Sequence, residues 1–419
     1  MQRKNKKDLR VFLFALFTLV CFNPYMLVLV HVPQLHVMGG SLLQLVFLVL
    51  YFILVVSVGG TINTKGAVWS CVVIQAIGLM LSFVVHGAGG YFLIGITMLL
   101  VLFMISYIDK TIGLRTFFEY YNKWILLMAI GGTALFVMAF IGIPPIADYK
   151  NPVSEIDTMS SWIIGFTNTY RSMAGEIFSF VRYSGYFDEP GAMGYWGIYA
   201  LVFNKLFYDN KKLEIALLIL LLFTFSMGYF VQAFAYVFLF YVMKRSKFRL
   251  PILIVIALAV TGIYFTKNTE YSDIYKASFG RFERMTETTG SDVMIEDRRG
   301  YVTEEAKKVF MQNPIMGVGA KEWAEMPYMA DNPYETLARD GIVGTLYWYM
   351  PYILLLILGL KRKDNVLLRL FLVLFLGFLH RPFQMTVLAF FVTYSLLYLY
   401  EKSYTRRLPS RISSNSSVQ

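Results

Sequence analysis

Cysteine, histidine and charge are scarce in this chain of 419 residues, which has two cysteines and four histidines. Cys21 and Cys71 both fall inside apolar runs, so they provide neither a disulfide framework nor a metal-binding Cys-x-x-Cys pattern. Charged residues make up 16% of the chain, against 57% for hydrophobic residues. This balance excludes an ordinary soluble domain and indicates a membrane protein.

Long apolar runs dominate the sequence instead. Segments of roughly eighteen or more apolar residues recur, which is the length that an α-helix needs to cross about 30 Å of hydrocarbon. The formal net charge of +11 lies mainly in short loops beside these runs, where it sets orientation and does not indicate a nucleic-acid partner. The expected fold is an all-α polytopic integral membrane protein, because alternating strands of about ten residues are lacking.

The distribution of basic residues predicts about twelve crossings with both termini in the cytoplasm. No small-residue cleavage site follows the basic start, so the first run is expected to be an uncleaved span. Leu213–Met243 has basic clusters at both ends and is short for two crossings, which predicts two short helices that meet at Ser226-Met227-Gly228. The other expected spans are Val11–Val30, Ser41–Gly59, Ala67–Val85, Tyr91–Ile108, Trp124–Ile143, one ending near Phe207, Leu250–Phe265, Ile342–Leu360 and two flanking His380-Arg381-Pro382.

This threading gives a single membrane domain over residues 1–400 with two large external loops, about 144–190 and 267–341. The basic, Ser-rich tail 401–419 is expected to be cytoplasmic and disordered. Helices can be joined by much shorter connections. Long loops on a membrane scaffold usually carry function, so the functional residues are expected in these two loops.

The first loop closes with Arg182-Tyr183-Ser184-Gly185-Tyr186-Phe187-Asp188-Glu189-Pro190-Gly191. Arginine, carboxylates, glycine and proline together predict a rigid, charged rim at the membrane surface. The alternative is an interfacial anchor, because Tyr and Arg are common at that depth. Adjacent carboxylates are costly near hydrocarbon, and this favours a functional role for Glu189, with Tyr186 beside it.

The second loop contains an expected amphipathic helix over Tyr301–Gln312. Arg298 and Arg299 fall at its N-terminal end, where free backbone N–H groups favour an anion and guanidinium groups can bind phosphate in bidentate fashion. Solvated salt bridges with Glu283 or Glu296 are the alternative. The apolar positions that define the helix are Val302, Ala306, Val309 and Phe310.

Further along this loop, Asp331-Asn332-Pro333 predicts the capped start of a short helix that ends at Gly341. Capping alone would explain Asp331 and Asn332, although it is compatible with catalysis. Gly317-Val318-Gly319 predicts a tight turn without a nucleotide-binding pattern. His380, in the last external turn, is either an interfacial polar residue or a base.

The pattern Arg182-x-x-Gly185-x-x-Asp188-Glu189-Pro190-Gly191 resembles the Wzy family of O-antigen and exopolysaccharide polymerases, which shares a superfamily with the O-antigen ligases. So does the later succession of Arg299, an amphipathic helix, Asn313-Pro314-x-x-Gly317-x-Gly319 and Asn332-x-Tyr334-x-x-Leu337-x-x-x-Gly341-Ile342-x-Gly344. The resemblance covers the central and C-terminal half. Over the first 120 residues it extends only to hydropathy.

The resemblance implies a GT-C-like, metal-independent glycosyltransferase of the bacterial cytoplasmic (inner) membrane without a cofactor. Its substrates would be undecaprenyl-diphosphate-linked oligosaccharides in the lipid bilayer, and a chain-length regulator is an implied partner. Ligases carry a His where this chain has Asp331, which favours a polymerase; an O-antigen ligase and a lipid-linked oligosaccharide flippase remain the alternatives. The expected diphosphate-binding residues are Arg182, Arg299, Arg298 and Arg281; the candidate bases are Asp331, Glu189 and His380; and Asn332, Tyr334, Glu335 and Tyr186 are expected to contact substrate.

Overall fold

The computed structural model describes residues 66–141, 143–150, 158–161, 168–171, 182–185, 187, 189–243, 249–269, 298–326, 332–378 and 386–415, with the isolated positions 49, 53, 272 and 275. Over these ranges the chain is mainly helical and contains one four-stranded sheet. The first two expected spans, Val11–Val30 and Ser41–Gly59, lie outside the described residues except for two of the isolated positions.

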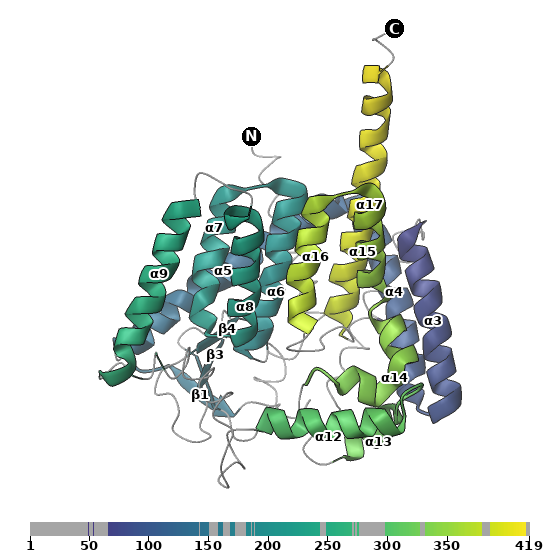
Figure 1. The fold of residues 1–419 in the computed structure, drawn as a ribbon, viewed down its shortest axis with the longest axis horizontal. Helices are drawn as coiled ribbons and strands as arrows, with labels where there is room; N and C mark the ends of the chain where they lie inside the picture. Colours follow the sequence, from purple (N-terminus) through teal and green to yellow (C-terminus); the bar gives the residue numbers. More distant parts are fainter. Residues whose placement is uncertain are drawn as a thin grey trace.

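The long helices stand side by side in a bundle, and a layer of shorter helices crosses one end of it (Figure 1). The bundle helices are α3 (Ala67–His86), α4 (Gly89–Thr111), α5 (Leu114–Phe140), α6 (Pro190–Phe203), α7 (Lys211–Leu220), α8 (Met227–Val237), α9 (Arg249–Phe265), α15 (Met350–Arg362), α16 (Asn365–Phe378) and α17 (Val387–Asn415). The crossing layer consists of α12 (Arg298–Gln312) and α13 (Gly319–Glu325), and α14 (Glu335–Trp348) joins it to α15.

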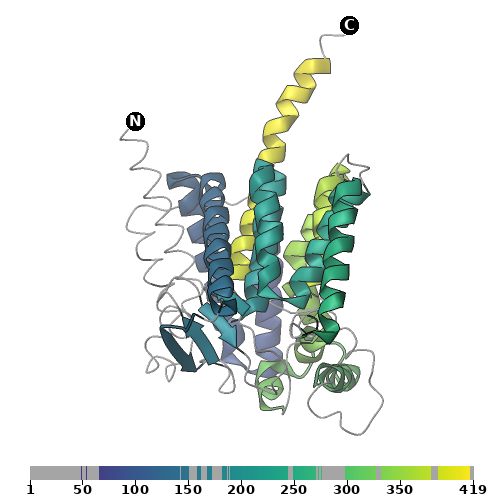
Figure 2. The same cartoon turned by 90° about the vertical axis from the view of Figure 1, so that its left-hand side faces the viewer.

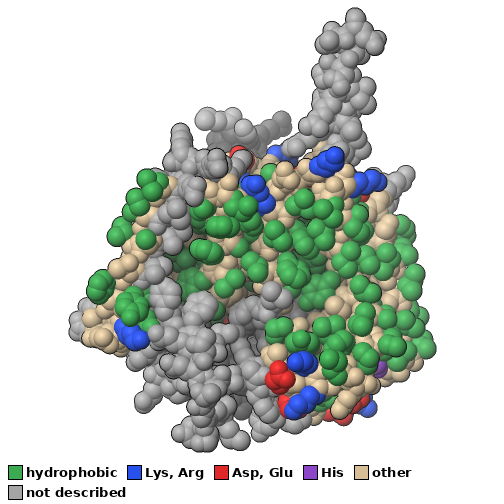
Figure 3. Space-filling view, in the orientation of Figure 1, with side chains coloured by type: hydrophobic (Ala, Val, Ile, Leu, Met, Phe, Trp, Pro, Cys, Tyr) green, Lys and Arg blue, Asp and Glu red, His purple; other side chains and the backbone are tan. Residues whose placement is uncertain are grey.

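Four helical stretches are long and apolar enough to cross a membrane by length and composition: Ala67–His86, Gly89–Thr111, Leu114–Ala139 and Glu335–Arg362. All four overlap expected spans. Hydrophobic side chains spread over the flanks of the helices, while lysine, arginine and the acids gather towards the two ends (Figure 3). Since hydrocarbon favours apolar side chains at mid-height and charge at the boundaries, this distribution fits a membrane protein.

The expected break within Leu213–Met243 is confirmed. The ten-residue α7 passes into the 3₁₀ turn η4 (Leu221–Thr224), and the eleven-residue α8 begins at Met227. Phe225 between them has a left-handed backbone (φ 46°), and the Ser226 hydroxyl accepts a hydrogen bond from the Tyr229 N–H, which caps α8. At about 1.5 Å per residue, each α-helix is well short of about 30 Å of hydrocarbon.

A four-stranded antiparallel meander lies below α5 and α6, with strand order β1-β2-β3-β4. This sheet differs from the expectation that the external loops contain only helices. Four-residue strands are too short for a period-two pattern to be recognised, which explains the omission. The strands are β1 (Ala147–Lys150), β2 (Thr158–Ser161), β3 (Asn168–Arg171) and β4 (Arg182–Gly185).

The two ends of the bundle differ. The sheet, α12 and α13 lie at one end, which we call the sheet end, and α17 projects from the other (Figures 1 and 2). At this second end the Lys402 ammonium pairs with Asp109 at 2.5 Å, and the Glu401 carboxylate accepts hydrogen bonds from the first N–H of α3. We call it the basic end, because α7 begins there with Lys211, α15 ends there with Arg362, and Lys402 of α17 pairs with Asp109 there.

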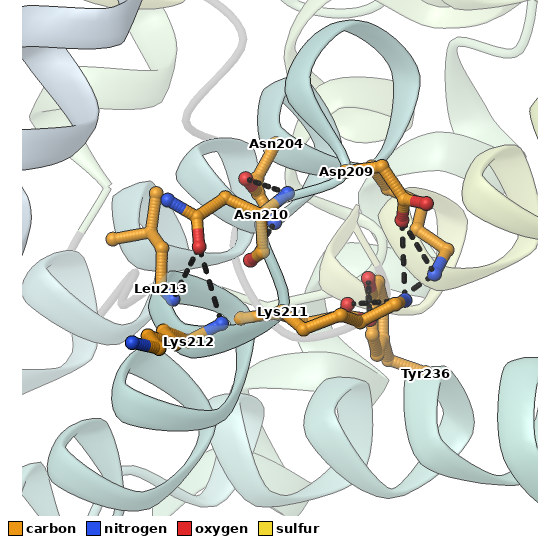
Figure 4. A network of polar contacts seen from close by, with 9 residues as sticks. Asn204, Asp209, Asn210, Lys211, Lys212, Leu213 and Tyr236 are labelled. Carbon is orange, nitrogen blue, oxygen red and sulfur yellow. Dashed lines mark hydrogen bonds and ion pairs between the residues drawn. The ribbon is translucent and has the colours of Figure 1, made fainter.

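A buried carboxylate fastens the π-helical turn η3 (Asn204–Tyr208), which follows α6, to α7 and α8 at the basic end (Figure 4). Glu214 is fully buried and pairs with the ammonium groups of Lys211 at 2.9 Å and Lys205 at 3.3 Å. The Tyr236 hydroxyl donates a further hydrogen bond to it at 2.7 Å. Asn210 caps α7 by accepting from two backbone N–H groups. The turn between α6 and α7 is thus fixed by paired charges as well as by packing.

The expectation of a disordered tail is wrong for residues 401–415. Helix α17 continues to Asn415 and passes through Pro409 without ending (Figure 1). Lys402 and Glu401 are tied to α4 and α3, so the helix leaves the bundle with its preceding turn already anchored. Helix propagation from a formed turn costs less than nucleation, which explains why a polar segment continues the helix.

Candidate functional site

Asp340 is a fully buried carboxylate near the sheet end that accepts three hydrogen bonds. The Tyr91 hydroxyl donates to its Oδ1 at 2.6 Å. The Trp348 indole N–H and the Arg339 Nε–H both donate to Oδ2 at 2.9 Å. A buried charge is tolerated only when it is paired and hydrogen-bonded. Asp340 therefore fixes α14 against α4.

Arg339 has a second acidic partner one turn earlier. Its Nη1 lies 3.4 Å from Glu335 Oε1, and the two side chains are 15% and 16% exposed. We call Glu335, Arg339 and Asp340 the Arg339 cluster. It is a guanidinium held by one fully buried carboxylate and one that is mostly buried. These three side chains are all the charged side chains of α14.

A sharp kink at Gly341 directly follows the Arg339 cluster in α14. Gly341 has a backbone that side chains rarely adopt (φ 67°, ψ −169°), so the expected end of the loop helix at this residue is confirmed. A Cβ here would overlap the Ile315 carbonyl, and one on Gly317 would overlap the Arg339 carbonyl. The glycines at positions 317 and 341 thus allow the backbone of the loop before α13 to lie directly against the backbone of the kink in α14.

Backbone hydrogen bonds fasten this loop to the kink on both sides. Val318 N–H donates to the Ala338 carbonyl at 3.1 Å, and Ile342 N–H donates to the Pro314 carbonyl at 2.9 Å. The α3–α4 hairpin adds two contacts. His86 Nε2 lies 3.1 Å from the Met316 carbonyl oxygen, and the Ala320 N–H donates to the Tyr91 hydroxyl at 3.0 Å. Tyr91 thereby joins the loop directly to Asp340.

Helix α12 confirms the expected amphipathic helix, which begins at Arg298 and ends at Gln312. Val302 and Ala306 are buried, and Ala306 packs with Trp323 of α13 and Ala338 of α14. Arg298 and Arg299 therefore occupy its first turn, as predicted. The structure fixes their backbone position at the sheet end, and their side chains lie outside the description.

Strand β4 carries Arg182 to the boundary between the sheet and the bundle. The next residue, Tyr183, is fully buried; its ring covers Gly132 of α5, and its hydroxyl donates to the Leu220 carbonyl at 2.9 Å. Arg182 itself is half-buried. Because Tyr183 is held from two sides, the Arg182 backbone is fixed against α5 and the end of α7.

Glu189 lies directly before α6, whose first residue is Pro190. Its carbonyl accepts from the Met193 N–H at 3.3 Å, which closes the first helical turn. Phe187 is buried and its ring lies 6.4 Å from that of Trp196. Arg182 and Glu189 therefore lie at the two ends of the segment between β4 and α6, which we call the β4–α6 junction. The rigid, charged rim expected here stays a prediction.

Aromatic side chains link this junction to the Arg339 cluster. The Tyr349 hydroxyl lies beside Thr336 and within electrostatic reach of Glu335 and Arg339. Its ring is 5.0 Å from Phe378, which lies 4.3 Å from Tyr352. The chain continues by hydroxyl contacts from Tyr352 to Tyr199 of α6 at 2.5 Å and on to Tyr195 at 3.5 Å. We call Tyr195, Tyr199, Tyr349, Tyr352 and Phe378 the aromatic bridge.

Besides Arg298 and Arg299, the described residues include three predicted residues of the second loop, Asn332, Tyr334 and Glu335. Asn332 is buried and its side-chain oxygen accepts from the Tyr334 N–H at 2.9 Å, which closes a turn before the helix. The expected helix start at Asp331-Asn332-Pro333 and its capping by Asn332 are wrong, because α14 begins at Glu335 and its N-cap, Tyr334, makes no side-chain capping bond. Tyr334 packs with α12 and α13, and Glu335 contacts Arg339. Asp331, His380, Arg281 and Tyr186 lie outside the described residues. In the described ranges, no three His, Cys, Asp or Glu side chains are grouped to hold a metal ion.

Arg339, Asp340 and Tyr91 were missed by the sequence analysis. A signal was available, since Arg339-Asp340 is a charged pair at the start of the apolar run Ile342–Leu360. Ionisable residues at such a position are expensive and usually paired. Their partner could not be found from the sequence, because Tyr91 is 249 residues away in sequence.

Comparison of the chain with known protein families finds no match, and comparison with curated proteins also finds none.

Proposed function

We propose that the chain is a polysaccharide polymerase of the bacterial cytoplasmic membrane. It transfers a growing glycan from undecaprenyl diphosphate to a lipid-linked repeat unit at the outer face. The proposal includes the GT-C-like arrangement of about twelve spans, with the basic end in the cytoplasm as basic loops prefer. Its motif basis is the resemblance of Arg182 to Gly191 and of Asn313 to Gly344 to the Wzy family.

One observation carries the proposal: elements of both large loops meet at the sheet end. Strand β4 brings Arg182 there, α12 begins there with Arg298 and Arg299, and α14 supplies Arg339 (Figure 1). Arg182 lies more than a hundred residues before Arg298 in the sequence. A gathering of arginines at one end of an apolar bundle suits a substrate whose lipid lies in the membrane and whose diphosphate lies at its surface.

The chemistry requires two things of the protein. Cleavage of the bond to the donor diphosphate builds negative charge on the leaving group, and fixed arginines can stabilise that charge. The acceptor hydroxyl needs a base within hydrogen-bond reach. Arg182 and Arg299 are proposed to bind the diphosphate, with Arg298 and Arg281 as further candidates. Asp331, Glu189 and His380 are the candidate bases, and of these Glu189 belongs to the described β4–α6 junction.

The direct test is polymer formation by the purified protein. Synthetic undecaprenyl-diphosphate repeat units of the source organism's own polysaccharide are incubated with it in detergent, with EDTA and no nucleotide. A ladder of products supports a metal-independent polymerase. Transfer to a lipid A core acceptor without a ladder would indicate a ligase. Movement of the substrate across a vesicle membrane without any new glycosidic bond would indicate a flippase and refute the proposal.

A further inference from the structure

Residues of two apolar spans hold the loop between α12 and α13 at the sheet end. The Val343 N–H, just after the kink in α14, donates to the Ile315 carbonyl at 3.1 Å. In addition, His86 Nε2, at the end of α3, lies 3.1 Å from the Met316 carbonyl oxygen. Both of these helical stretches, α3 and α14 with α15, are long and apolar enough to cross a membrane. The loop 313–316, which we call the Ile315 loop, is therefore fastened to the ends of two spans.

Large apolar side chains are exposed on and beside this loop. Ile315 is 66% exposed, although its backbone is fixed by the hydrogen bond to Val343. Val84 and Val85, in the last turn of α3, are 74% and 51% exposed, and Ile342, next to the kink in α14, is 46% exposed. We call Val84, Val85, Ile315 and Ile342 the Ile315 patch. Exposed apolar side chains that gather in one region mark contact with another molecule or with a membrane.

The lengths of the two spans place the Ile315 patch at the edge of the hydrocarbon. Helix α3 has 20 residues, and it starts at the basic end, where the Ala67 N–H donates to Glu401. The stretch from Ile342 to Arg362, which also reaches the basic end, has a similar length. At about 1.5 Å per residue, each rises about 30 Å, which is the thickness of the hydrocarbon. Ile315 is therefore level with the boundary between acyl chains and headgroups at the sheet end.

A lipid leaflet is the occupant that fits the Ile315 patch. Ile77 of α3 is 64% exposed and lies two helical turns before Val84 on the same face, so the patch extends the apolar flank of a span. The chain carries no charged residue between Lys308 and Lys321. Burial of apolar surface, and not attraction between charges, would therefore drive the contact.

We propose that the Ile315 loop inserts its tip, Pro314-Ile315, into the lipid leaflet at the sheet end and anchors the crossing layer there. The loop belongs to a segment expected to be wholly external, so this contact is a membrane anchor in addition to the spans. Because the loop joins α12 to α13 and is bonded to the kink in α14, the anchor keeps these three helices at one height (Figure 1). Such an anchor does not depend on any enzymatic activity.

The test is the membrane depth of the loop in the purified full-length protein, reconstituted into phosphatidylcholine nanodiscs. A nitroxide spin label is attached to Ile315→Cys and, separately, to Pro314→Cys, in a background in which Cys21 and Cys71 are replaced by Ala. Collision rates with oxygen, which concentrates in hydrocarbon, and with a nickel chelate, which stays in water, give the depth. Both labels are expected about 5–10 Å into the boundary between headgroups and acyl chains, the depth typical of interfacial segments.

Lys308→Cys is the matched control, since the Lys308 side chain is charged and 65% exposed on the neighbouring α12. Its label should collide mainly with the nickel chelate, and a label at Ile77→Cys mainly with oxygen. Labels at positions 314 and 315 that are as accessible to nickel as the label at position 308 would overturn the anchor. Labels shielded from both reagents would also overturn it. Spin–spin broadening that is removed by dilution with unlabelled protein would then identify a second copy as the cover, and its absence would identify another segment of this chain.

Discussion

The ring of Tyr183 lies directly on the backbone of Gly132, where a Cβ would overlap it. This contact joins β4 to α5 and holds Arg182 at the sheet end. Replacing Gly132 by Ala should displace the ring and cost about 1–3 kcal/mol, as overpacking of a core usually does. The measurement is thermal unfolding in detergent together with polymer length.

Gly262 of α9 supplies the control for this variant. It has open space around its Cβ position, so Gly262→Ala should leave stability unchanged or raise it by up to about 1 kcal/mol through helix propensity. If both alanine variants unfold at the same temperature as the wild type, the Tyr183 contact does not hold β4 in place.

Gly341→Ala should separate the loop 313–319 from the kink in α14. The new Cβ meets the Ile315 carbonyl and also requires a left-handed backbone at residue 341. We expect faster proteolysis of the α12–α13 layer and loss of polymer. Gly87→Ala has a similar positive φ (63°) but nothing within contact distance, so it should show backbone strain of only about 1–2 kcal/mol. Equal protease resistance of the two variants would contradict this account.

Glu214→Gln tests the charge network at the basic end. The substitution leaves Lys205 with a buried stem and no buried carboxylate. Removal of one partner of a buried pair costs about 3–5 kcal/mol, and the value here should fall below this because Lys211 is half exposed. Glu119→Gln, in an exposed pair with Lys123, should change stability by less than about 1 kcal/mol. The two melting temperatures decide the comparison.

Arg182→Ala and Arg299→Ala should each abolish polymer while leaving protein abundance unchanged. Both remove a positive charge that is proposed to stabilise the departing diphosphate, and losses of this kind reach about a hundred-fold or more in rate. Gel analysis of polymer from cells, with immunoblots of the membrane fraction, makes the measurement. Normal chain length in either variant would exclude that arginine from the site. Arg369→Ala, on α16, is a cationic control expected to retain polymer.

The sequence predicted best what depends on local pattern and charge. The break at Ser226, the amphipathic helix α12 and the end of the loop helix at Gly341 all follow from residue type and spacing, and all are present. Four long apolar helices agree with expected spans, while the total number of crossings stays a prediction.

Features built from distant segments could not be predicted in this way. The hydrogen bond between Tyr91 and Asp340 and the cover of Gly132 by Tyr183 depend on how the bundle folds. The strands β1 to β4 have four residues each, which is too few for an alternating pattern to be recognised in the sequence. The continuation of α17 beyond Glu401 depends on anchoring by Asp109 and Ala67, which no local propensity shows.

The separation of Tyr91 from Asp340 has a consequence for biosynthesis. At about 5–20 residues per second, the 249 intervening residues take roughly 12–50 s to translate. During that time the α3–α4 hairpin enters the membrane with the Tyr91 hydroxyl lacking its eventual acceptor. The sheet end is therefore completed late, when α14 arrives, and a nascent chain halted before residue 340 would contain α3 to α9 but neither the last three bundle helices nor the contact between Tyr91 and Asp340.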